Sequence, residues 1–211
     1  MNYYISDLHF FCQDQTQEGP ESYAKRPFAN VEEMNAYMLD RWNRKVTDKD
    51  TVYILGDIAH QDMSEPLLEL IARLRGKKVL IAGNHDNAKC RKFKKLFEEV
   101  CDYKEIRDVS NGKNYSLALF HYPILMWCGQ HKGKILLYGH THSTAEDDFF
   151  QRCLQQLPNL TGFTMKDGRK LAAYNVGCMK PYMDYEPRTL EEIIAKRGCV
   201  RFTACGRVTE V

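Results

Sequence analysis

Two histidines one residue apart close an apolar run in the stretch KILLYGHTHS, residues 134–143. A single histidine at a strand end is usually an ordinary polar residue, so His140 and His142 by themselves are weak evidence of a site. They gain weight because other apolar runs in the chain end in side chains of the same kinds. Sites in open α/β sheets are assembled from loops beyond the ends of several strands. The repetition therefore predicts one shared site of metal binding or acid–base chemistry.

Four further runs deliver carboxylate, imidazole or amide side chains at their ends. In chain order they are NYYISDLH with Asp7 and His9, TVYILGDI with Asp57, KKVLIAGNHD with Asn84, His85 and Asp86, and SLALFHYP with His121. Each run is rich in Val, Ile, Leu, Tyr or Phe, as buried strands require. Five of the seven histidines stand at such ends, and His60 and His131 are expected at the surface or behind the site.

The one-residue gaps have a physical reason. Residues i and i+2 of an extended segment point the same way, so Asp7 with His9, and His140 with His142, can converge on one cavity. The glycines beside these ends are Gly56, Gly83 and Gly139. They allow sharp turns and a close approach of the backbone to a ligand, and plain turn formation is compatible with that use.

Taken in order, D-x-H, G-D, G-N-H-D, a later H and G-H-x-H resemble the calcineurin-like metallophosphoesterase family. The resemblance covers most of the chain, residues 1–180. It implies an α/β fold of four layers, two mixed β-sheets flanked by helices, with two metal ions at the strand ends. It also implies which residues hold each ion. The first set is Asp7, His9, Asp57 and His142, and the second is Asp57, Asn84, His121 and His140.

The shared position in that assignment suits an aspartate on chemical grounds. A carboxylate has two oxygens and can span ions about 3.5–4 Å apart, whereas an imidazole ligates through one nitrogen. Mixed imidazole, carboxylate and amide ligands suit Mn, Fe, Co, Ni or Zn better than Ca or Mg, and we expect two divalent ions with Mn²⁺ first among them. Two such ions and two aspartates leave a net positive site that attracts phosphate.

Four other residues receive hypotheses. His85 is not needed as a ligand, so we assign it the role of general acid, with Asp86 either orienting the imidazole or stabilising the turn. Residues 10–29 form a long polar connection, which suggests a wall or lid over the metals. Within it, Arg26 either grips phosphate oxygens or fixes the loop. Tyr122 either lines the substrate site or belongs to the core.

Length and composition set bounds. The 211 residues are expected to form a single domain, 1–211, and a net charge of +2 gives no strong field toward nucleic acid or membrane. The first motif strand begins at residue 2 and no apolar run reaches the ~18 residues of a membrane span, so we expect a cytoplasmic protein. The eight cysteines lack framework spacing and are expected to be reduced. Oligomeric state stays open.

Helical patterns alternate with the strand patterns, as a layered fold expects. The predicted helices span residues 30–44, from Ser64 to Leu74, 88–100, 143–157 and 189–196. The segment AKCRKFKKLFEE in the third invites a nucleic-acid interpretation. Its apolar residues recur at helical spacing, however, which favours a solvated basic face. The acids at the start of the fourth are interpreted as helix caps, and Lys180 and Tyr182 are expected at the rim of the site.

Departures from family branches narrow the function. The chain has GDIAHQD and GNHD where Ser/Thr protein phosphatases have G-D-x-x-D-R-G and G-N-H-E, so that branch is disfavoured. The leading hypothesis is a phosphodiesterase acting on a nucleotide-like or other small organic phosphate by attack of metal-bound hydroxide. A phosphomonoesterase, a single-strand nuclease and a catalytically silent metal- or phosphate-binding scaffold are the alternatives.

Overall fold

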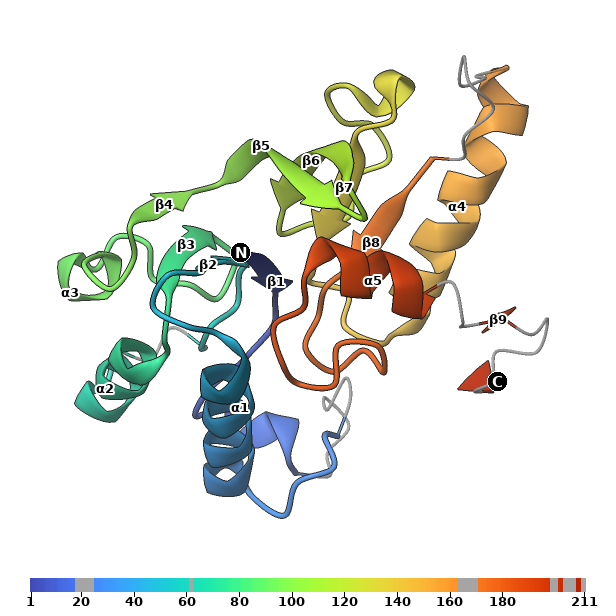
Figure 1. Ribbon diagram of the computed structural model, residues 1–211. Coiled ribbons are helices and arrows are strands. Elements are labelled where there is room, and N and C mark those ends of the chain that lie inside the picture. The colour runs from blue at the N-terminus through green and yellow to red at the C-terminus, as the bar shows by residue number, and fades with distance from the viewer. Residues whose placement is uncertain (18–24, 61–62, 163–170, 198–200, 203–207, 210–211) are drawn as a thin grey trace.

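The computed structural model describes residues 1–17, 25–60, 63–162, 171–197, 201–202 and 208–209, and its ribbon is drawn in Figure 1. Two four-stranded sheets form its centre. The first contains β1 (Asn2–Ile5), β2 (Thr51–Ile54), β3 (Lys77–Ile81) and β4 (Glu99–Cys101), and the second contains β5 (Tyr103–Ser110), β6 (Lys113–Phe120), β7 (Ile135–Tyr138) and β8 (Ala173–Asn175). A separate antiparallel pair joins β9 (Arg201–Phe202) to β10 (Val208–Thr209).

The two sheets differ in strand direction. The first is entirely parallel, because each of its strands follows a crossover from the one before. The second is mixed, with β5 antiparallel to β6 and with β6, β7 and β8 parallel. The prediction of two mixed sheets is therefore correct for the second sheet alone. Parallel strands covered on both faces appear in the sequence as continuous apolar runs, which is why β1, β2 and β3 could be predicted.

Helices cover the outer faces of the sheets. They are α1 (Val31–Lys45), α2 (Glu65–Arg73), α3 (Arg91–Lys94), α4 (Ala145–Thr161) and α5 (Leu190–Arg197), with short 3₁₀ turns at Gln13–Gln15 and Gln130–Lys132. In Figure 1, α1 and α2 lie beside the first sheet and α4 lies beyond the second. The side chain of Asn30 accepts from the backbone N–H of Glu33 and caps α1, where the helix predicted over 30–44 begins.

The third predicted helix is wrong in extent. The pattern predicted a helix over 88–100, but α3 ends at Lys94 and the chain then enters β4. Val100 pairs with Leu80 of β3, so strand pairing overrides the helical spacing of Phe93 and Phe97. The fourth helix instead runs four residues further than predicted, to Thr161.

Two apolar clusters hold the layers together. The larger lies between the sheets and reaches α1 and α2, with Ile54 of β2 and Leu137 of β7 both fully buried in it. The smaller packs Tyr138 of β7 against Phe150 and Leu154 of α4. Since both sheets contribute to the larger cluster, the strand ends of both are held at fixed positions relative to each other.

The cysteines within the described residues are free thiols, namely Cys12, Cys90, Cys101, Cys128, Cys153 and Cys178. The expectation of reduced cysteines is confirmed for these six. The same expectation for Cys199 and Cys205 lies outside the described residues, as does the part of the predicted lid over 18–24. Within the described part of the chain, no helix combines the length and apolar character needed to cross a membrane.

Candidate metal centre

The predicted ligands come together where the two sheets meet. Strands β1, β2 and β3 are parallel neighbours, so their carboxyl ends open at one edge. The ends of β6 and β7 reach the same place. The backbone N–H of His140 donates to the carboxylate of Asp7 at 3.0 Å, and the backbone N–H of Ser6 donates to the carbonyl of Val176 at 2.9 Å. These bonds join the first sheet to the second directly at the site.

The first group consists of Asp7, His9 and His142, whose ligating atoms lie within 4.8 Å of one another. Nε2 of His9 is 3.1 Å from Nε2 of His142, and the latter is 3.6 Å from Oδ1 of Asp7. Asp7 is fully buried and His9 nearly so. Burial lowers the pKa of His9, and the charge of Arg26 and the neighbouring imidazole of His142 act in the same direction. Its imidazole is therefore neutral at pH 7, the form that ligates metals.

The second group consists of Asp57, His121 and His140, again within 4.8 Å, and Asn84 completes it. Oδ1 of Asn84 is 3.1 Å from Nε2 of His121 and 3.0 Å from Nδ1 of His140. The other ring nitrogen of His121, Nδ1, lies 2.7 Å from the carbonyl oxygen of Leu55. A backbone carbonyl at that position fixes the proton on Nδ1 and leaves Nε2 for a ligand.

Asp57 is a member of the second group and also lies beside His9 of the first. Its Oδ2 is 3.8 Å from Nε2 of His9 and 3.4 Å from Nε2 of His121, whereas its Oδ1 accepts the backbone N–H of His85 at 3.0 Å. One oxygen thus points between the groups and the other is held by the GNHD turn. Both carboxylate oxygens were expected to span two ions, but Oδ2 alone lies between the two groups.

The donor set fits a pair of divalent transition-metal ions. Bonds of about 2.1 Å in tetrahedral or octahedral geometry separate neighbouring donor atoms by about 3.0–3.4 Å. The measured separations are 3.1 Å between His9 and His142 and 3.0 Å between Asn84 and His140. Two imidazole nitrogens face each other in the first group. As bases they would repel each other, and a cation bound between them would explain the contact.

Several of these residues adopt left-handed backbone conformations that L-residues usually avoid. They are Asp7 (φ 56°), His9 (φ 50°), Asp57 (φ 56°), His140 (φ 68°) and His142 (φ 48°). Each costs of the order of 1–2 kcal/mol relative to an ordinary conformation. Such residues cluster at functional sites, where the surroundings hold them in place. The predicted i, i+2 convergence is present, but sharp turns rather than extended strand produce it.

Glycines allow the close approach that these turns need. A Cβ atom on Gly83 would lie 2.2 Å from Oδ1 of Asp57, and one on Gly139 would lie 2.6 Å from Oδ2 of Asp7. Both distances are far below any real contact. Side chains at these two positions would displace the carboxylates, so glycine is required there.

The charge of the second group is set by an ion pair. Burial opposes charge on His121, but its contact with Asp57 and the negative charges of Asp7 and Asp57 raise its pKa to about 9. Burial also opposes charge on Asp57, and His121 and His9 nevertheless lower its pKa to about 2. In the metal-free protein at pH 7, His121 is therefore protonated and Asp57 ionised.

His85 and Asp86 are positioned differently from each other. The half-buried ring of His85 lies 5.6 Å from that of His9, and burial lowers its pKa. The carboxylate of Asp86 turns away from it and accepts the backbone N–H groups of Asp57, Ile58 and Gly83, each at 2.9 Å. These contacts match the turn-stabilising alternative, and among the described residues no contact joins Asp86 to the His85 ring.

His60, which was expected at the surface or behind the site, is a neighbour of His85. The two ring centroids are 4.2 Å apart and the planes are inclined by 35°. His60 is exposed, so this pair lies at the surface beside the ligands. The signal in the sequence was its position three residues after Asp57, within GDIAHQD.

Arg26 lies behind the site. Only 1% of the residue is exposed, and its guanidinium donates to the carbonyl oxygens of Asp7 and Leu8, each at 2.7 Å. Because Asp7 has a left-handed backbone, two bonds to adjacent carbonyls hold the strained turn. These contacts correspond to the loop-fixing alternative, and the buried guanidinium has no path to a substrate phosphate.

Tyr122 lies at the mouth of the second group. Its ring centroid is 4.6 Å from that of His140 and 4.9 Å from that of His121, and the residue is half-buried. Burial raises the pKa of its hydroxyl, which stays protonated at neutral pH. The ring therefore adjoins the ligands and is partly exposed, a position open to a substrate group.

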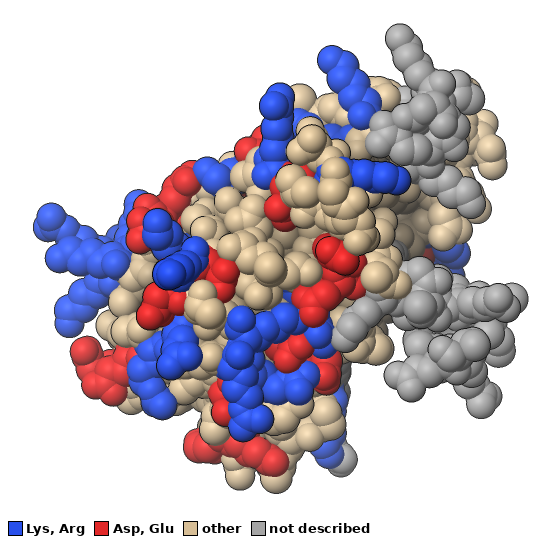
Figure 2. Space-filling view, in the orientation of Figure 1, with Lys and Arg blue, Asp and Glu red and all other residues tan. Residues whose placement is uncertain are grey.

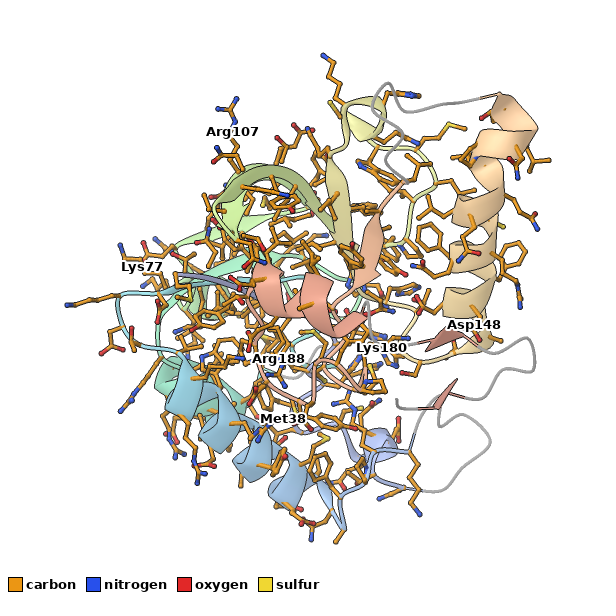
Figure 3. All side chains as sticks on the ribbon, turned by 45° about the vertical axis from the view of Figure 1, so that its right-hand side comes forward. Met38, Lys77, Arg107, Asp148, Lys180 and Arg188 are labelled. Atoms are coloured by element: carbon orange, nitrogen blue, oxygen red, sulfur yellow. The ribbon has the colours of Figure 1, made fainter. Side chains whose placement is uncertain are left out.

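A buried polar cluster supports the GHTH turn from beneath. Asp147 of α4 accepts from Tyr138 at 2.6 Å, from Thr141 at 3.1 Å and from Asn175 at 3.0 Å. Lys180 forms an ion pair with Asp147 at 2.8 Å, near the beginning of α4 (Figure 3). Asp147 was interpreted from sequence as a helix cap, and its burial at 5% exposure instead gives it an internal role.

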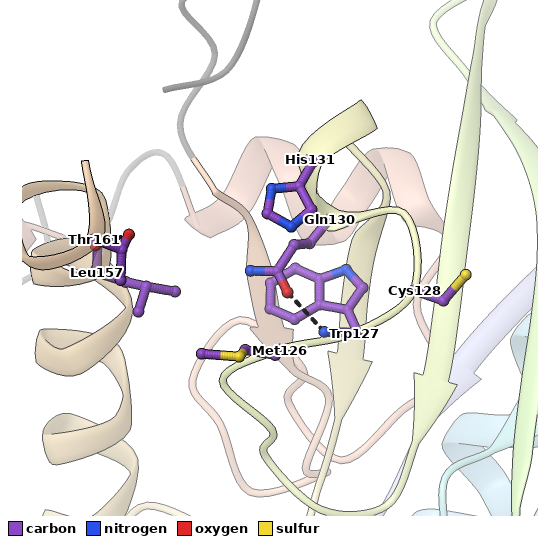
Figure 4. Close-up of a pocket in the computed structure, with 7 residues that line it drawn as sticks. All are labelled: Met126, Trp127, Cys128, Gln130, His131, Leu157 and Thr161. Carbon is purple, nitrogen blue, oxygen red and sulfur yellow. Dashed lines mark hydrogen bonds between the residues drawn. The ribbon is translucent and has the colours of Figure 1, made fainter. Parts of the chain in front are cut away.

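A further pocket lies away from these residues. It has a volume of about 460 Å³ and is lined by Met126, Trp127, Cys128, Gln130, His131, Leu157 and Thr161 (Figure 4). The turn at Gln130–Lys132 precedes β7, whereas His140 follows it. The pocket therefore opens toward the opposite end of that strand from the ligands, and it contains none of the predicted site residues.

Comparisons with known proteins agree with this geometry. The family model for calcineurin-like phosphoesterases matches residues 3–115. The chain is 37% identical over 148 residues to the uncharacterized protein MJ1445 of Methanocaldococcus jannaschii, which covers 70% of this chain and 72% of that protein. It is 26% identical over 167 residues to the Gene 66 protein of Mycobacterium phage D29, covering 67% of this chain and 78% of that protein.

A solved structure shares the fold. The protein of unknown function AQ665 from Aquifex aeolicus superposes with a TM-score of 0.58 at 24% identity, covering 93% of this chain and 98% of that one. At this identity the likeness concerns the arrangement of sheets and helices alone.

Proposed function

Because the chain belongs to the calcineurin-like phosphoesterase family, we propose that it is a phosphodiesterase that works with two divalent transition-metal ions. Mn²⁺ is the expected ion, with Fe, Zn, Ni and Co as the other candidates. The observation that carries the proposal is the place of Asp57. Its Oδ2 is within 4 Å of both His9 and His121, one from each group. An isolated single-ion site would not need a carboxylate directed at two sets of ligands.

When bound, two divalent ions neutralise phosphate oxygens and generate a nucleophile from water at neutral pH. The residues of the chain determine where this happens. Asp7 and Asp57 are buried and oppose the metal charge, while neutral His9, His140 and His142 add none. The resulting excess of positive charge favours an anionic substrate over a neutral one.

His85 is the residue proposed to handle the leaving group. It follows Asn84, its backbone N–H donates to Asp57, and its half-exposed ring lies beside His9. A leaving alkoxide needs a proton, and an imidazole within reach supplies one. Since burial lowers the pKa of His85, the negative charge of a bound phosphate must favour the protonated form. The effect of His85 should therefore be largest at slightly acidic pH.

The unligated imidazole of His85 favours an enzyme over a silent scaffold. A scaffold that only binds metal or phosphate has no use for an unligated acid beside the ligands. The half-buried ring of Tyr122 offers a surface for the organic part of a substrate, which supports a nucleotide-like or other small organic phosphate ester.

A substrate panel tests the proposal. Purified protein reconstituted with Mn²⁺ is assayed with phosphomonoesters, linear and cyclic diesters and short oligonucleotides. We expect hydrolysis of diesters to exceed that of monoesters and to stop on chelation. Absence of turnover on every ester at saturating metal would contradict the proposal, and turnover confined to monoesters would replace it with a phosphomonoesterase.

A further inference from the structure

A strip of basic side chains begins directly after the GNHD turn. The segment Lys89–Lys95, called the basic segment below, carries Lys89, Arg91, Lys92, Lys94 and Lys95. All five are exposed, while Phe93 within the segment is 1% exposed and anchors it to the core. In Figure 2, blue side chains gather at the left edge, where α3 lies in Figure 1. Their charges therefore face solvent on a segment that is fixed from inside.

These cations have no acidic partners within the described residues, in contrast to the cations of α1. There, Arg41 pairs with Glu186 at 2.9 Å and Lys45 pairs with Glu192 at 2.6 Å. No acidic residue occurs between Asn87 and Phe97. The net charge of the whole chain is only +2, so the basic segment is a local excess and not a sample of a uniformly basic surface.

The position of the basic segment relates it to the candidate metal centre. Asp86 fixes the GNHD turn, and the next bonds run from the N–H of Ala88 to the carbonyl of Asp86 at 3.0 Å and from that of Cys90 to Asn87 at 3.0 Å. The chain then returns to the amino-terminal end of β3, where the N–H of Glu98 donates to the carbonyl of Lys78. Lys89 follows His85 by four residues, a reach of at most about 14 Å. The exposed cations thus begin just after the GNHD turn and continue along the flank of the molecule.

We propose that the basic segment binds the phosphate backbone of a single nucleic-acid strand whose scissile phosphate occupies the metal centre. The proposal rests on the proposed function and names its substrate class. A small ester has one phosphate, which the metal centre already accommodates, and would leave five flanking cations unused. A strand with a phosphate at every nucleotide can engage the centre and the segment together, and a flexible single strand can bend into a site with buried ligands.

Charge reversal tests the proposal. Binding of a fluorescein-labelled 20-nucleotide oligothymidylate is measured by anisotropy in EDTA, where no hydrolysis occurs. The test variant combines Lys89→Glu, Arg91→Glu and Lys92→Glu. Each single-strand phosphate contact contributes about 0.7 to the slope of log affinity against log salt, so losing three should reduce the slope by about 2. We expect affinity at low salt to fall by at least about 10-fold.

A matched variant carries the same change in net charge elsewhere. Arg107, Lys113 and Lys132 are exposed, belong to the second sheet or the turn before β7, and have no acidic partner within the described residues; Arg107 projects outward in Figure 3. Reversing these three should change affinity less than twofold. Equal losses in both variants, or no binding by the wild type, would overturn the proposal. The proposal would also be overturned if the first variant lost binding to phosphatidylserine vesicles but kept its binding to oligothymidylate.

A second readout separates this proposal from the proposed function. Hydrolysis of bis-p-nitrophenyl phosphate with Mn²⁺ should be the same in the wild type and both triple variants, because none of the reversed residues belongs to the candidate metal centre. Oligothymidylate cleavage should fall in the first variant alone. If the wild type hydrolyses the small diester but both variants cleave the oligonucleotide equally well, the nucleic-acid surface is wrong and the phosphodiesterase stands.

Discussion

The side-chain amide of Asn175 donates a hydrogen bond of 3.0 Å to the backbone carbonyl oxygen of His142. Lys180 donates to the same oxygen at 3.3 Å, and both residues also bind the buried carboxylate of Asp147. His142 has a left-handed backbone, so these donors hold a conformation that it would otherwise leave. The buried polar cluster around Asp147 therefore orients a ligand of the first group.

Asn175→Ala should weaken metal binding at the first group more than at the second. Loss of a residue that orients a ligand costs about 10–100-fold in metal affinity. Titration of the apoprotein with Mn²⁺ by calorimetry should show one step shifted to higher concentration and the other retained. The exposed Asn114, replaced by Ala, is the control. Two unchanged steps in Asn175→Ala would remove the orienting role.

The backbone at His142 predicts an unusual order of stability. In the metal-free protein, His142→Gly should be more stable than His142→Ala by about 1 kcal/mol, because glycine adopts φ of +48° without strain. At His121, which is not among the positive-φ residues, the order should reverse, because glycine there only adds unfolded-state entropy. Urea unfolding in EDTA measures all four variants. The same order at both positions would contradict stored strain.

The His121–Asp57 pair predicts a pH dependence of the metal-free protein. The pKa of His121 is raised to about 9, above the ordinary 6.5, so its contribution is complete below pH 6.5 and is lost as pH rises through 9. Unfolding free energy in EDTA should fall between pH 6.5 and 9.5 by an amount on the order of 2 kcal/mol more than in Asp57→Asn. Identical pH profiles for the two proteins would show that the pair is not ionic.

His85→Asn should distinguish esters by their leaving groups. An acid matters in proportion to the basicity of the departing group, so kcat/KM should fall about 10²–10⁴-fold for an alkyl ester and much less for a p-nitrophenyl ester. Metal content should stay near that of the wild type, because His85 lies outside both groups of ligands. Equal losses for both esters at unchanged metal content would leave His85 as a phosphate-positioning residue.

The sequence could predict which residues lie together at the candidate site, because the signals for them are local. The seven predicted ligands follow five apolar runs, and the carboxyl ends of neighbouring parallel strands open at one edge of a sheet. The roles of Arg26, Asp86 and Asp147 depended on what their side chains meet in space. Arg26 donates to the carbonyl oxygen of Asp7 in the turn after β1. Asp147 of α4 accepts from Asn175 at the end of β8. Spacing along the chain carries no record of such partners.

The extent of α3 was beyond sequence reasoning for the same reason. Phe93 and Phe97 have helical spacing, and the pairing of Val100 with β3 decides the outcome through a neighbour about twenty residues earlier. His60 was likewise visible only as a lone histidine, and its contact with His85 follows from the packing of two loops.

Metal stoichiometry in the wild type and in Asp57→Asn tests the central claim most directly. Apoprotein is titrated with Mn²⁺, and bound metal is counted after removal of free ions. The proposal predicts two ions per chain in the wild type and weakened binding of both in Asp57→Asn. The amide removes the negative charge of the carboxylate, whose Oδ2 faces both groups. His9→Ala should weaken mainly the first. No bound ion in the wild type at saturating Mn²⁺, or an Asp57→Asn variant that binds two ions as tightly as before, would contradict the shared dinuclear centre.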